Sequence, residues 1–318
     1  MSSTFDDRSL AAIPADAAPP LVKIAALLAT GYAVHWSLSP PNPPPAPKTC
    51  VDNRTLFERA IRHVTFCTKM MTWAFVLADA LVTLHLAFPS PLTSLFAAAL
   101  LPAGTGAFPD ALASSLSTSS LSSTATTTST PMVGALLTPS WLLLLGSVVV
   151  SCGAVLRLAC FRALGSLFTF EITISPDHTL VTAGPYSHVR HPSYTGVYAL
   201  LLGSTAVMLA PGAWLREAWL VPSACAAVRG LAGMVEDLGL ERREDVGAGE
   251  GSCLGRPGAV GAILAWAFVI FWTTKVTYAL KSTNKRVQTE DRELHRVFGS
   301  QWEEWADRVR WRLVPWVY

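Results

Sequence analysis

Two polar segments of the 318-residue sequence contain the side chains whose types and spacing could do chemistry. The first, GPYSHVRHPSY from Gly184 to Tyr194, groups two imidazoles, a guanidinium and two phenols directly before an apolar run. The second, from Arg286 to Tyr318, follows another apolar run and contains the adjacent acids Glu290 and Asp291. Polar groups at the end of a membrane-spanning segment need partners. The two segments together can therefore form a cradle for a polar ligand.

The turns of the first segment favour a ligand cradle over a competing interpretation. That alternative is a belt of aromatic and basic residues that anchors helix ends at the membrane surface. Pro185 and Pro192 fix two turns, while Gly184 and Gly196 admit close approach of another backbone. The groups between these turns can donate hydrogen bonds and stack, as ligand-binding groups do.

Metal chemistry is not indicated by the histidines or the cysteines. His188 and His191 form an HxxH pair, but no third histidine, cysteine or carboxylate stands at a helpful local spacing. The six cysteines are scattered without CxxC pairs, so they suggest neither a zinc site nor a disulfide framework. We predict no metal site.

A glycine-rich stretch imitates a nucleotide-binding loop without its context. The sequence VGAGEG contains Gly247, Gly249 and Gly251, as a Rossmann-type loop would. It follows the charged run from Glu241 to Asp245, whereas a Rossmann loop follows a hydrophobic strand. We therefore predict no Rossmann fold, and any nucleotide-like cofactor must be bound without one.

The elements that position these residues are membrane helices. Hydrophobic residues make up 51% of the chain and charged residues 14%, below the roughly 25% of soluble domains. The net charge of +2 is too small to imply nucleic acid. Segments of roughly 20 apolar residues can span a bilayer as helices. We predict an all-α, polytopic protein with about five transmembrane helices, at Leu21 to Leu38, Phe66 to Phe88, Met132 to Phe161, Tyr194 to Leu209 and Gly258 to Leu280. Two shorter stretches, Pro91 to Leu101 and Trp214 to Val228, are expected to be interfacial or re-entrant.

Basic residues in the loops predict the orientation of these helices. Four of them follow the first span, the loop after the second span has none, and eight lie in the C-terminal tail. The tail and the segment from Arg162 to Ser193 are therefore expected in the cytosol, and the N-terminus in the lumen. The tail has apolar residues near helical spacing and a break at Gly299, which predicts a cytosolic amphipathic helical tail. We divide the chain into an N-terminal anchor region (1–131) and a membrane-embedded core (132–318) with a variable luminal loop at about 211–256.

At the two polar segments the chain resembles the isoprenylcysteine carboxyl methyltransferase family of endoplasmic reticulum membrane enzymes. The carrying stretches are DHTLVTAGPYSHVRHPSYTG (Asp177 to Gly196) and RVQTEDRELHRVFGSQWEEWADRVRWRLVP (Arg286 to Pro315). The resemblance covers roughly the C-terminal half, and the SLSPPNPPP stretch after the first span is similar to the fungal branch. Asp291, Trp302 and Trp305 depart mildly from the family pattern, and the insertion between about Leu220 and Arg256 departs more.

The resemblance implies S-adenosylmethionine as cofactor and the carboxylate of a farnesyl- or geranylgeranyl-cysteine on a processed CaaX protein as acceptor. It assigns cofactor positions to His178, Thr179, Leu180, Val181, Tyr186, His191, Pro192, Ser193, Tyr194 and Glu290. Arg286 falls at the substrate-binding arginine, and Arg308 at a second arginine linked to activity. It also implies an endoplasmic reticulum membrane protein whose active site and C-terminus face the cytosol, in contact with membrane lipid. Whether it forms a homodimer is left open.

The residues make chemical sense of methyl transfer to a carboxylate. An α-carboxyl group has a pKa of about 3.3 to 3.7, so the acceptor is already ionised and needs no general base. Arg286 and Arg308 suit the task of aligning it. Glu290 can take the ammonium or ribose hydroxyls of the cofactor, and backbone donors near Val189 to His191 can hold the rest. His191 is then a binder and not a base.

Three other functions compete with this one. A phospholipid or other small-molecule membrane methyltransferase would use the same cradle, but the paired arginines argue against an amine acceptor. A reductase related to sterol reductases is disfavoured by the acidic pair and the FG-containing tail, Phe298 and Gly299. The non-enzymatic alternative is a membrane scaffold whose aromatic tail coats the surface.

Overall fold

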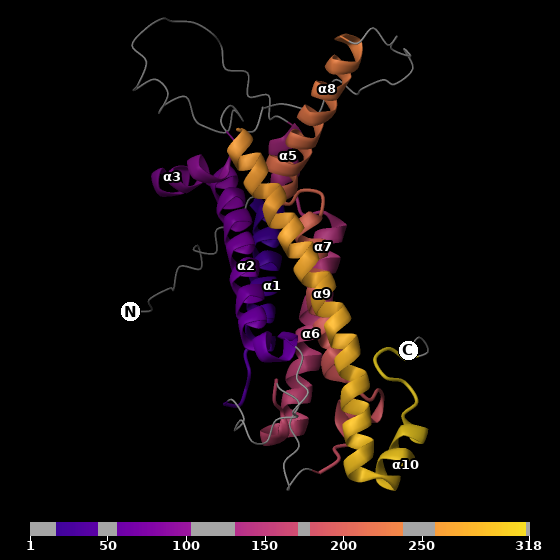
Figure 1. The fold of residues 1–318 in the computed structure, drawn as a ribbon. Helices are drawn as coiled ribbons and strands as arrows, with labels where there is room; N and C mark the ends of the chain where they lie inside the picture. Colours follow the sequence, from indigo (N-terminus) through magenta and orange to yellow (C-terminus); the bar gives the residue numbers. More distant parts are fainter. Residues whose placement is uncertain (1–16, 44–55, 103–130, 171–178, 238–257, 316–318) are drawn as a thin grey trace, which may run out of the picture.

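The computed structural model describes residues 17–43, 56–102, 131–170, 179–237 and 258–315, and within these ranges the regular structure is entirely helical (Figure 1). The predicted all-α class is confirmed. The helices are α1 (Ala18–Ser37), α2 (Leu56–Ala87), α3 (Pro91–Leu100), α5 (Pro131–Leu137), α6 (Trp141–Leu164), α7 (Pro192–Leu209), α8 (Val221–Asp237), α9 (Ala259–Phe298) and α10 (Ser300–Arg308). Three short helical turns join them: η3 (Gly165–Leu167), η4 (Gly184–Ser187) and the π-helix η5 (Leu215–Leu220).

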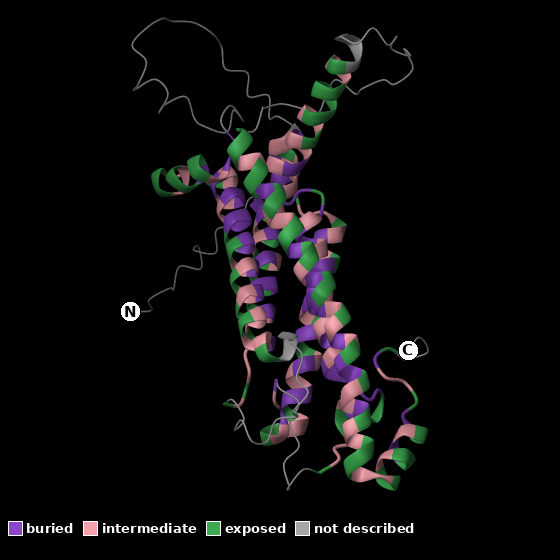
Figure 2. Ribbon diagram, in the orientation of Figure 1, coloured by how far each residue is buried: buried purple, intermediate pink, exposed green. Residues whose placement is uncertain are grey.

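Among the described residues, three helical stretches are long and apolar enough to cross a membrane, with bounds Arg59–Ala87, Met132–Leu167 and Ala259–Phe298. The other two predicted spans are helical as well, as α1 and α7, and pack in the same bundle (Figure 1). Helix α9 crosses the front of the bundle and exposes much of its surface (Figure 2). Its exposed residues include Val260, Ile263 and Phe271, which suits a face toward lipid.

The predicted span from Met132 to Phe161 is two helices and not one. Pro139 lacks a backbone N–H and interrupts the run, so α5 ends at Leu137. Ser140 then caps α6, because its side chain accepts a hydrogen bond from the backbone N–H of Leu143 at 3.3 Å.

Helix α9 extends beyond the span predicted for it. Its 40 residues are about 60 Å long, twice the hydrocarbon thickness of roughly 30 Å. Its apolar part ends near Leu280, and the polar part from Lys281 to Phe298 reaches beyond the membrane-spanning part to carry the second predicted site segment. The predicted break at Gly299 is confirmed, with a left-handed φ of 52° that glycine adopts without strain.

Helices α6 and α7 pack through glycines. A Cβ atom added to Gly153 would lie 2.7 Å from the Cβ of Ala199, and one added to Gly203 would lie 2.7 Å from Val150. At Gly196 an added Cβ would lie 2.8 Å from the carbonyl oxygen of Gly153, so the close approach predicted there is present. Small residues at such contacts let helices meet tightly in a membrane. The packing fixes the start of α7, where the first site segment enters the bundle.

The bundle has two distinct ends. We call the end that holds η4 and α10 the site end, and the opposite end the far end (Figure 1). The predicted cytosolic segments, Arg162 to Ser193 and the tail, do lie together at the site end in the parts that the structure describes.

A buried ion pair organises the far end. The Lys23 ammonium lies 2.7 Å from an oxygen of Asp79, and both side chains are fully buried. Lys23 also donates to the carbonyls of Leu136 and Gly212, each at 2.8 Å, while Asp79 accepts the backbone N–H of Trp214 at 3.1 Å. These bonds satisfy both charges, which is the condition for burying an ion pair without a large penalty. They tie α1, α2 and α5 to the turn before η5.

Candidate active site

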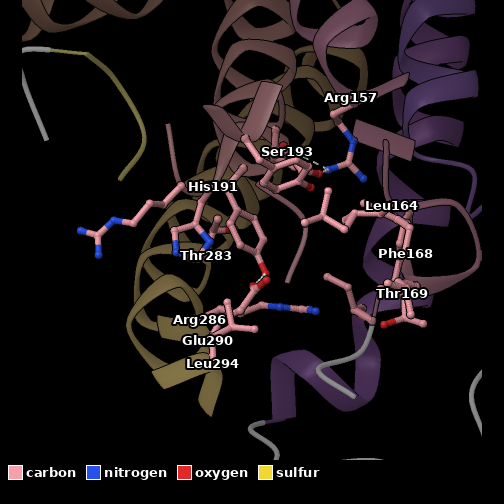
Figure 3. Close-up of a pocket in the computed structure, with 18 of the residues that line it drawn as sticks. Arg157, Leu164, Phe168, Thr169, His191, Ser193, Thr283, Arg286, Glu290 and Leu294 are labelled. Atoms are coloured by element: carbon pink, nitrogen blue, oxygen red, sulfur yellow. Dashed lines mark hydrogen bonds between the residues drawn. The ribbon is translucent and has the colours of Figure 1, made fainter. Parts of the chain in front are cut away.

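A cavity at the site end collects residues from both predicted site segments and from the N-terminal helices. Figure 3 shows Arg157, His191 and Ser193 around it, with Arg286 and Glu290 projecting from α9 on the other side. Helix α2 contributes Ile61, Val64, Thr65 and Thr68 to its wall. Helix α2, within the region 1–131 that we predicted to be an anchor, therefore supplies part of the cavity wall.

The cavity has an apolar part and a polar part. Toward the middle of the bundle it is walled by apolar side chains that include Val64, Leu201 and Ala279. Toward the site end its walls carry ionisable and hydroxyl groups, among them Tyr194 and Glu290. A ligand with a hydrocarbon tail and a polar head would match this division.

The central contact of the polar part joins the two predicted segments. The hydroxyl of Tyr194 donates a 2.7 Å hydrogen bond to Glu290. Arg286 lies one helical turn before Glu290 on α9, and its guanidinium carbon lies 5.8 Å from the centre of the Tyr194 ring. The three side chains thus form one connected group on the cavity wall.

Asp291, the neighbour of Glu290, has a different role from the one its adjacency suggests. Its side chain is buried and does not line the cavity. One oxygen lies 2.8 Å from Nε2 of His191, and the other lies 3.7 Å from Arg190 and 3.3 Å from Arg312. Burial by itself would raise the pKa of Asp291, but the His191 hydrogen bond and the surrounding positive charges hold that pKa below its ordinary value. Asp291 therefore serves as an ionised hub that orients His191.

The extended tail after α10 pairs with the residues before α7. The backbone N–H groups of Arg190 and His191 donate to the carbonyls of Trp311 and Arg312, at 2.9 and 2.8 Å. We expected the backbone donors near Val189 to His191 to hold the cofactor, and that expectation is wrong because the tail occupies the last two and Val189 donates to the Pro185 carbonyl at 3.5 Å. Their function is to fix the tail against the site.

The aromatic face of the tail packs on protein. Trp305 is buried against Tyr186, and its indole N–H donates to the Tyr186 carbonyl at 3.2 Å. Burial raises the pKa of the Tyr186 phenol well above its usual value, so that ring stays neutral. Among the described tail residues, Trp305, Val309 and Leu313 are buried, which a helix lying flat on a membrane would not require.

The sequence-predicted residues divide by their place. The cavity is lined by nine of them: the predicted cofactor residues Thr179, Leu180, Val181, Tyr186, His191, Ser193, Tyr194 and Glu290, and the predicted substrate residue Arg286. Pro192 starts α7 without lining the cavity, and His178 lies outside the described residues. Arg308 is exposed on α10, where its Nε donates to the Glu304 carbonyl at 3.3 Å, so the structure does not bring it to the cavity. Its role in activity stays a prediction.

Sequence reasoning missed Arg157. This arginine of α6 is 4% exposed and lines the cavity, with bonds from Nε to the Ser37 carbonyl at 2.8 Å and from Nη1 to the Ser193 hydroxyl at 3.0 Å. Three phenyl rings lie within 6 Å of its guanidinium carbon, at Phe161, Phe168 and Phe170. A lone cation inside an apolar run was the available signal, because ionisable residues within membrane helices are costly and usually functional.

The HxxH pair is separated in the structure. His188 is exposed beside Ser187, whereas His191 is buried against Asp291. Within the described ranges, no three histidine, cysteine or acidic side chains meet as a metal site would need.

Comparison with known proteins gives the same family as the sequence motifs. The model of the isoprenylcysteine carboxyl methyltransferase family matches residues 143–225. Protein-S-isoprenylcysteine O-methyltransferase of Xenopus laevis is 38% identical over 74 residues, which cover 23% of this chain and 26% of that protein. The proteins of the same name from Tribolium castaneum and Homo sapiens are 37% identical over 73 residues and 36% over 74 residues, covering 22% and 23% of this chain and 26% of each relative.

The matches have a limited extent. The chain matches about a quarter of the length of these curated relatives. No solved structure matches it. The family match includes Arg157 and the start of α7 but stops before Arg286 and Glu290, so the tail of the site rests on its own geometry. The matches thus agree with the family recognised in the motifs, and residues 143–225 match the model of the isoprenylcysteine carboxyl methyltransferase family.

Proposed function

We propose that this protein is a membrane methyltransferase that transfers a methyl group from S-adenosylmethionine to the C-terminal carboxylate of a prenylated cysteine. The observation that carries the proposal is a single cavity with an apolar part between α2, α7 and α9 and a polar part at Arg157, Arg286 and Glu290. An isoprenoid chain needs the first part, and a carboxylate and a charged cofactor need the second. The curated relatives bear the name of this activity.

The polar wall fits the chemistry of S-adenosylmethionine. The cofactor carries an ammonium group and ribose hydroxyls, for which the Glu290 carboxylate is a suitable acceptor. Tyr194 holds Glu290 in place through its 2.7 Å hydrogen bond, and the rings of Tyr186 and Tyr194 offer faces for the apolar parts of the cofactor. Thr179, Leu180 and Val181 complete this wall. When bound, S-adenosylmethionine supplies an electrophilic methyl group on a sulfonium sulfur.

Two arginines suit the acceptor carboxylate. Arg286 and Arg157 both line the cavity, from α9 and α6. A carboxylate that reached both guanidinium groups would accept paired hydrogen bonds. Because the acceptor is ionised at neutral pH, the chain's own groups have only to align it and need not remove a proton.

In this scheme His191 contacts the ligand, and Asp291 holds the His191 ring in place. The Asp291 hub fixes the His191 ring at the edge of the cavity, where it can contact a ligand without acting as a base. Arg308 is kept as a predicted second arginine of the reaction, although Arg157 is better placed.

We further propose that the site end faces the cytosol, in the endoplasmic reticulum membrane. The supporting observation is the excess of basic residues at that end, in the tail and, with Arg59 and Arg62, at the start of α2. S-adenosylmethionine and the processed CaaX proteins would both reach the cavity from that side. Membrane lipid would surround α9, whose apolar residues are exposed.

The test offers two acceptors to the lipid-embedded protein with methyl-labelled S-adenosylmethionine. N-acetyl-S-farnesylcysteine should gain a base-labile methyl ester, and phosphatidylethanolamine should gain nothing. Label on the lipid amine instead would overturn the acceptor in favour of a phospholipid methyltransferase. Label on neither acceptor would overturn methyl transfer and favour the reductase or the scaffold function instead.

A further inference from the structure

Lys275 is a half-buried amine in the apolar part of α9 that the proposed reaction does not use. Its ammonium donates a 3.0 Å hydrogen bond to the hydroxyl of Thr68 on α2. It also lies 3.8 Å from the centre of the Trp272 ring, a cation–π distance. A cation inside a membrane helix is costly and marks a functional position.

This contact lies at the apolar limit of the cavity. Of the cavity residues on α2, Thr68 is the farthest from the site end, and on α9 the farthest is Ala279. Lys275 precedes Ala279 by one helical turn, on the same face of α9. Thr68 therefore lines the inner end of the cavity on α2, and its hydrogen bond to Lys275 lies one helical turn beyond the last cavity residue of α9.

Helix α9 runs obliquely to α2 (Figure 1). Toward the far end the two helices share an apolar cluster that includes Phe75 of α2 and Ala265 of α9. In the space between them the cavity is walled by Ile61 and Val64 from one helix and by Thr283 from the other. An apolar chain can lie here until it meets the hydrogen bond.

Helix geometry gives the distance from Arg286, which would hold the carboxylate, to Lys275 next to the inner end of the cavity. Arg286 and Lys275 are eleven residues apart on one continuous helix, so their Cα atoms lie about 16 Å apart along the axis. A prenylcysteine held by its carboxylate at Arg286 would bring the last isoprene units of its chain to Lys275. A longer chain has to displace a charged amine from its partners.

We propose that the Lys275–Thr68 hydrogen bond sets the chain length that the cavity accepts, so that the site binds farnesyl-cysteine more tightly than geranylgeranyl-cysteine. The inference rests on the proposed function, since it takes prenylcysteine as the ligand. Lys275 and Thr68 are specificity-determining residues in this account and touch none of the reacting atoms.

The experiment measures dissociation constants for N-acetyl-S-farnesylcysteine and N-acetyl-S-geranylgeranylcysteine with the full chain in lipid nanodiscs, without cofactor. Lys275→Met and Thr68→Ala remove the hydrogen bond and free space at the inner end. Each should shift the ratio of the two constants toward geranylgeranyl by at least about 10-fold, the discrimination that one methylene can give in an apolar pocket. Thr68→Ser keeps the hydroxyl and should keep the wild-type ratio.

Matched controls lie on the exposed side of the same helix. Lys281→Met and Thr273→Ala make the same chemical changes away from the cavity and should leave the ratio unchanged. A wild-type ratio in both folded variants, or equal binding of the two ligands by the wild type, would overturn the inference.

Methyl ester formation by the wild type is measured separately. If the wild type forms the ester but the variants keep the wild-type ratio of dissociation constants, only the chain-length inference is overturned. If the variants shift the ratio but the wild type forms no ester, only the proposed methyl transfer is overturned.

Discussion

The hydroxyl of Tyr194 and the carboxylate of Glu290 are joined by a 2.7 Å hydrogen bond across the cavity wall, although 96 residues separate them in the chain. The bond connects the start of α7 with the part of α9 beyond its apolar span. Both residues were expected at the cofactor position, and the bond explains how two distant segments can hold one ligand.

Glu290→Gln should weaken binding of S-adenosylmethionine by at least about 10-fold, since a hydrogen bond to a charged group is worth roughly 1.5–3 kcal/mol. Tyr194→Phe keeps the carboxylate but releases it, and should cost a smaller factor of roughly 2 to 10. Calorimetric titration of the purified variants measures both. The exposed Glu304→Gln is the control for loss of one negative charge. Equal affinities in all three variants would remove Glu290 from the site.

Arg286→Ala should lower kcat/KM for the prenylcysteine by roughly 10- to 100-fold while leaving the affinity for S-adenosylmethionine within about 2-fold. The reason is that its guanidinium is proposed to hold the acceptor and not the cofactor. Steady-state kinetics with varied acceptor checks the first effect, and cofactor titration checks the second. Lys281→Ala, one and a half turns earlier and exposed, should behave as the wild type. A variant that loses cofactor instead of acceptor would contradict this assignment.

Arg157→Lys and Arg308→Ala together decide which arginine assists Arg286. Arg157→Lys keeps the charge but loses the planar donors that reach Ser37 and Ser193, and should reduce kcat/KM by at least about 10-fold. Arg308→Ala changes an exposed side chain and should reduce it far less. Thermal unfolding of both variants separates a loss of fold from a loss of acceptor alignment. The reverse order of effects would restore Arg308 as the second arginine.

Asp291→Asn should destabilise the docked tail and remove a pH dependence. The pKa of Asp291 is lower in the folded chain than in the unfolded chain, so its contribution to stability is present above the unfolded value of about 3.9 and is lost as pH falls through the folded value. Breaking one partner of a buried charge cluster costs on the order of 3–5 kcal/mol, because Arg190 and Arg312 are left without their acid.

The measurement is thermal unfolding in detergent at neutral pH and well below pH 3.9, where the contribution of Asp291 is lost. The wild type should lose stability on acidification, and Asp291→Asn should lose less because the titrating group is gone. Asp307→Asn, on the exposed side of α10, should follow the wild type. An Asp291→Asn curve that parallels the wild type at both pH values would show that the hub is not ionised.

The helical class and the partners Tyr194, Arg286 and Glu290 were predictable because apolar runs and short motifs are local properties of the sequence. The hydrogen-bond partners of Arg157 were not predictable, since Ser37 and Ser193 come from other helices. The role of Asp291 was missed for a related reason. Adjacent acids on a helix point in directions about 100° apart, so Glu290 faces the cavity while Asp291 faces the tail. Likewise, no sequence pattern predicts the backbone hydrogen bonds between residues 311 and 312 and residues 190 and 191.

The pairing of Arg190 and His191 with Trp311 and Arg312 has a consequence for biosynthesis. A ribosome makes residues 190 and 191, and then α7 and α8, before it makes the residues that close this rim. Until residues 311 and 312 are made, the backbone donors of residues 190 and 191 lack these acceptors. The site is therefore among the last parts of the protein to mature, and a chain interrupted within α10 would retain every helix of the bundle while lacking a finished binding rim.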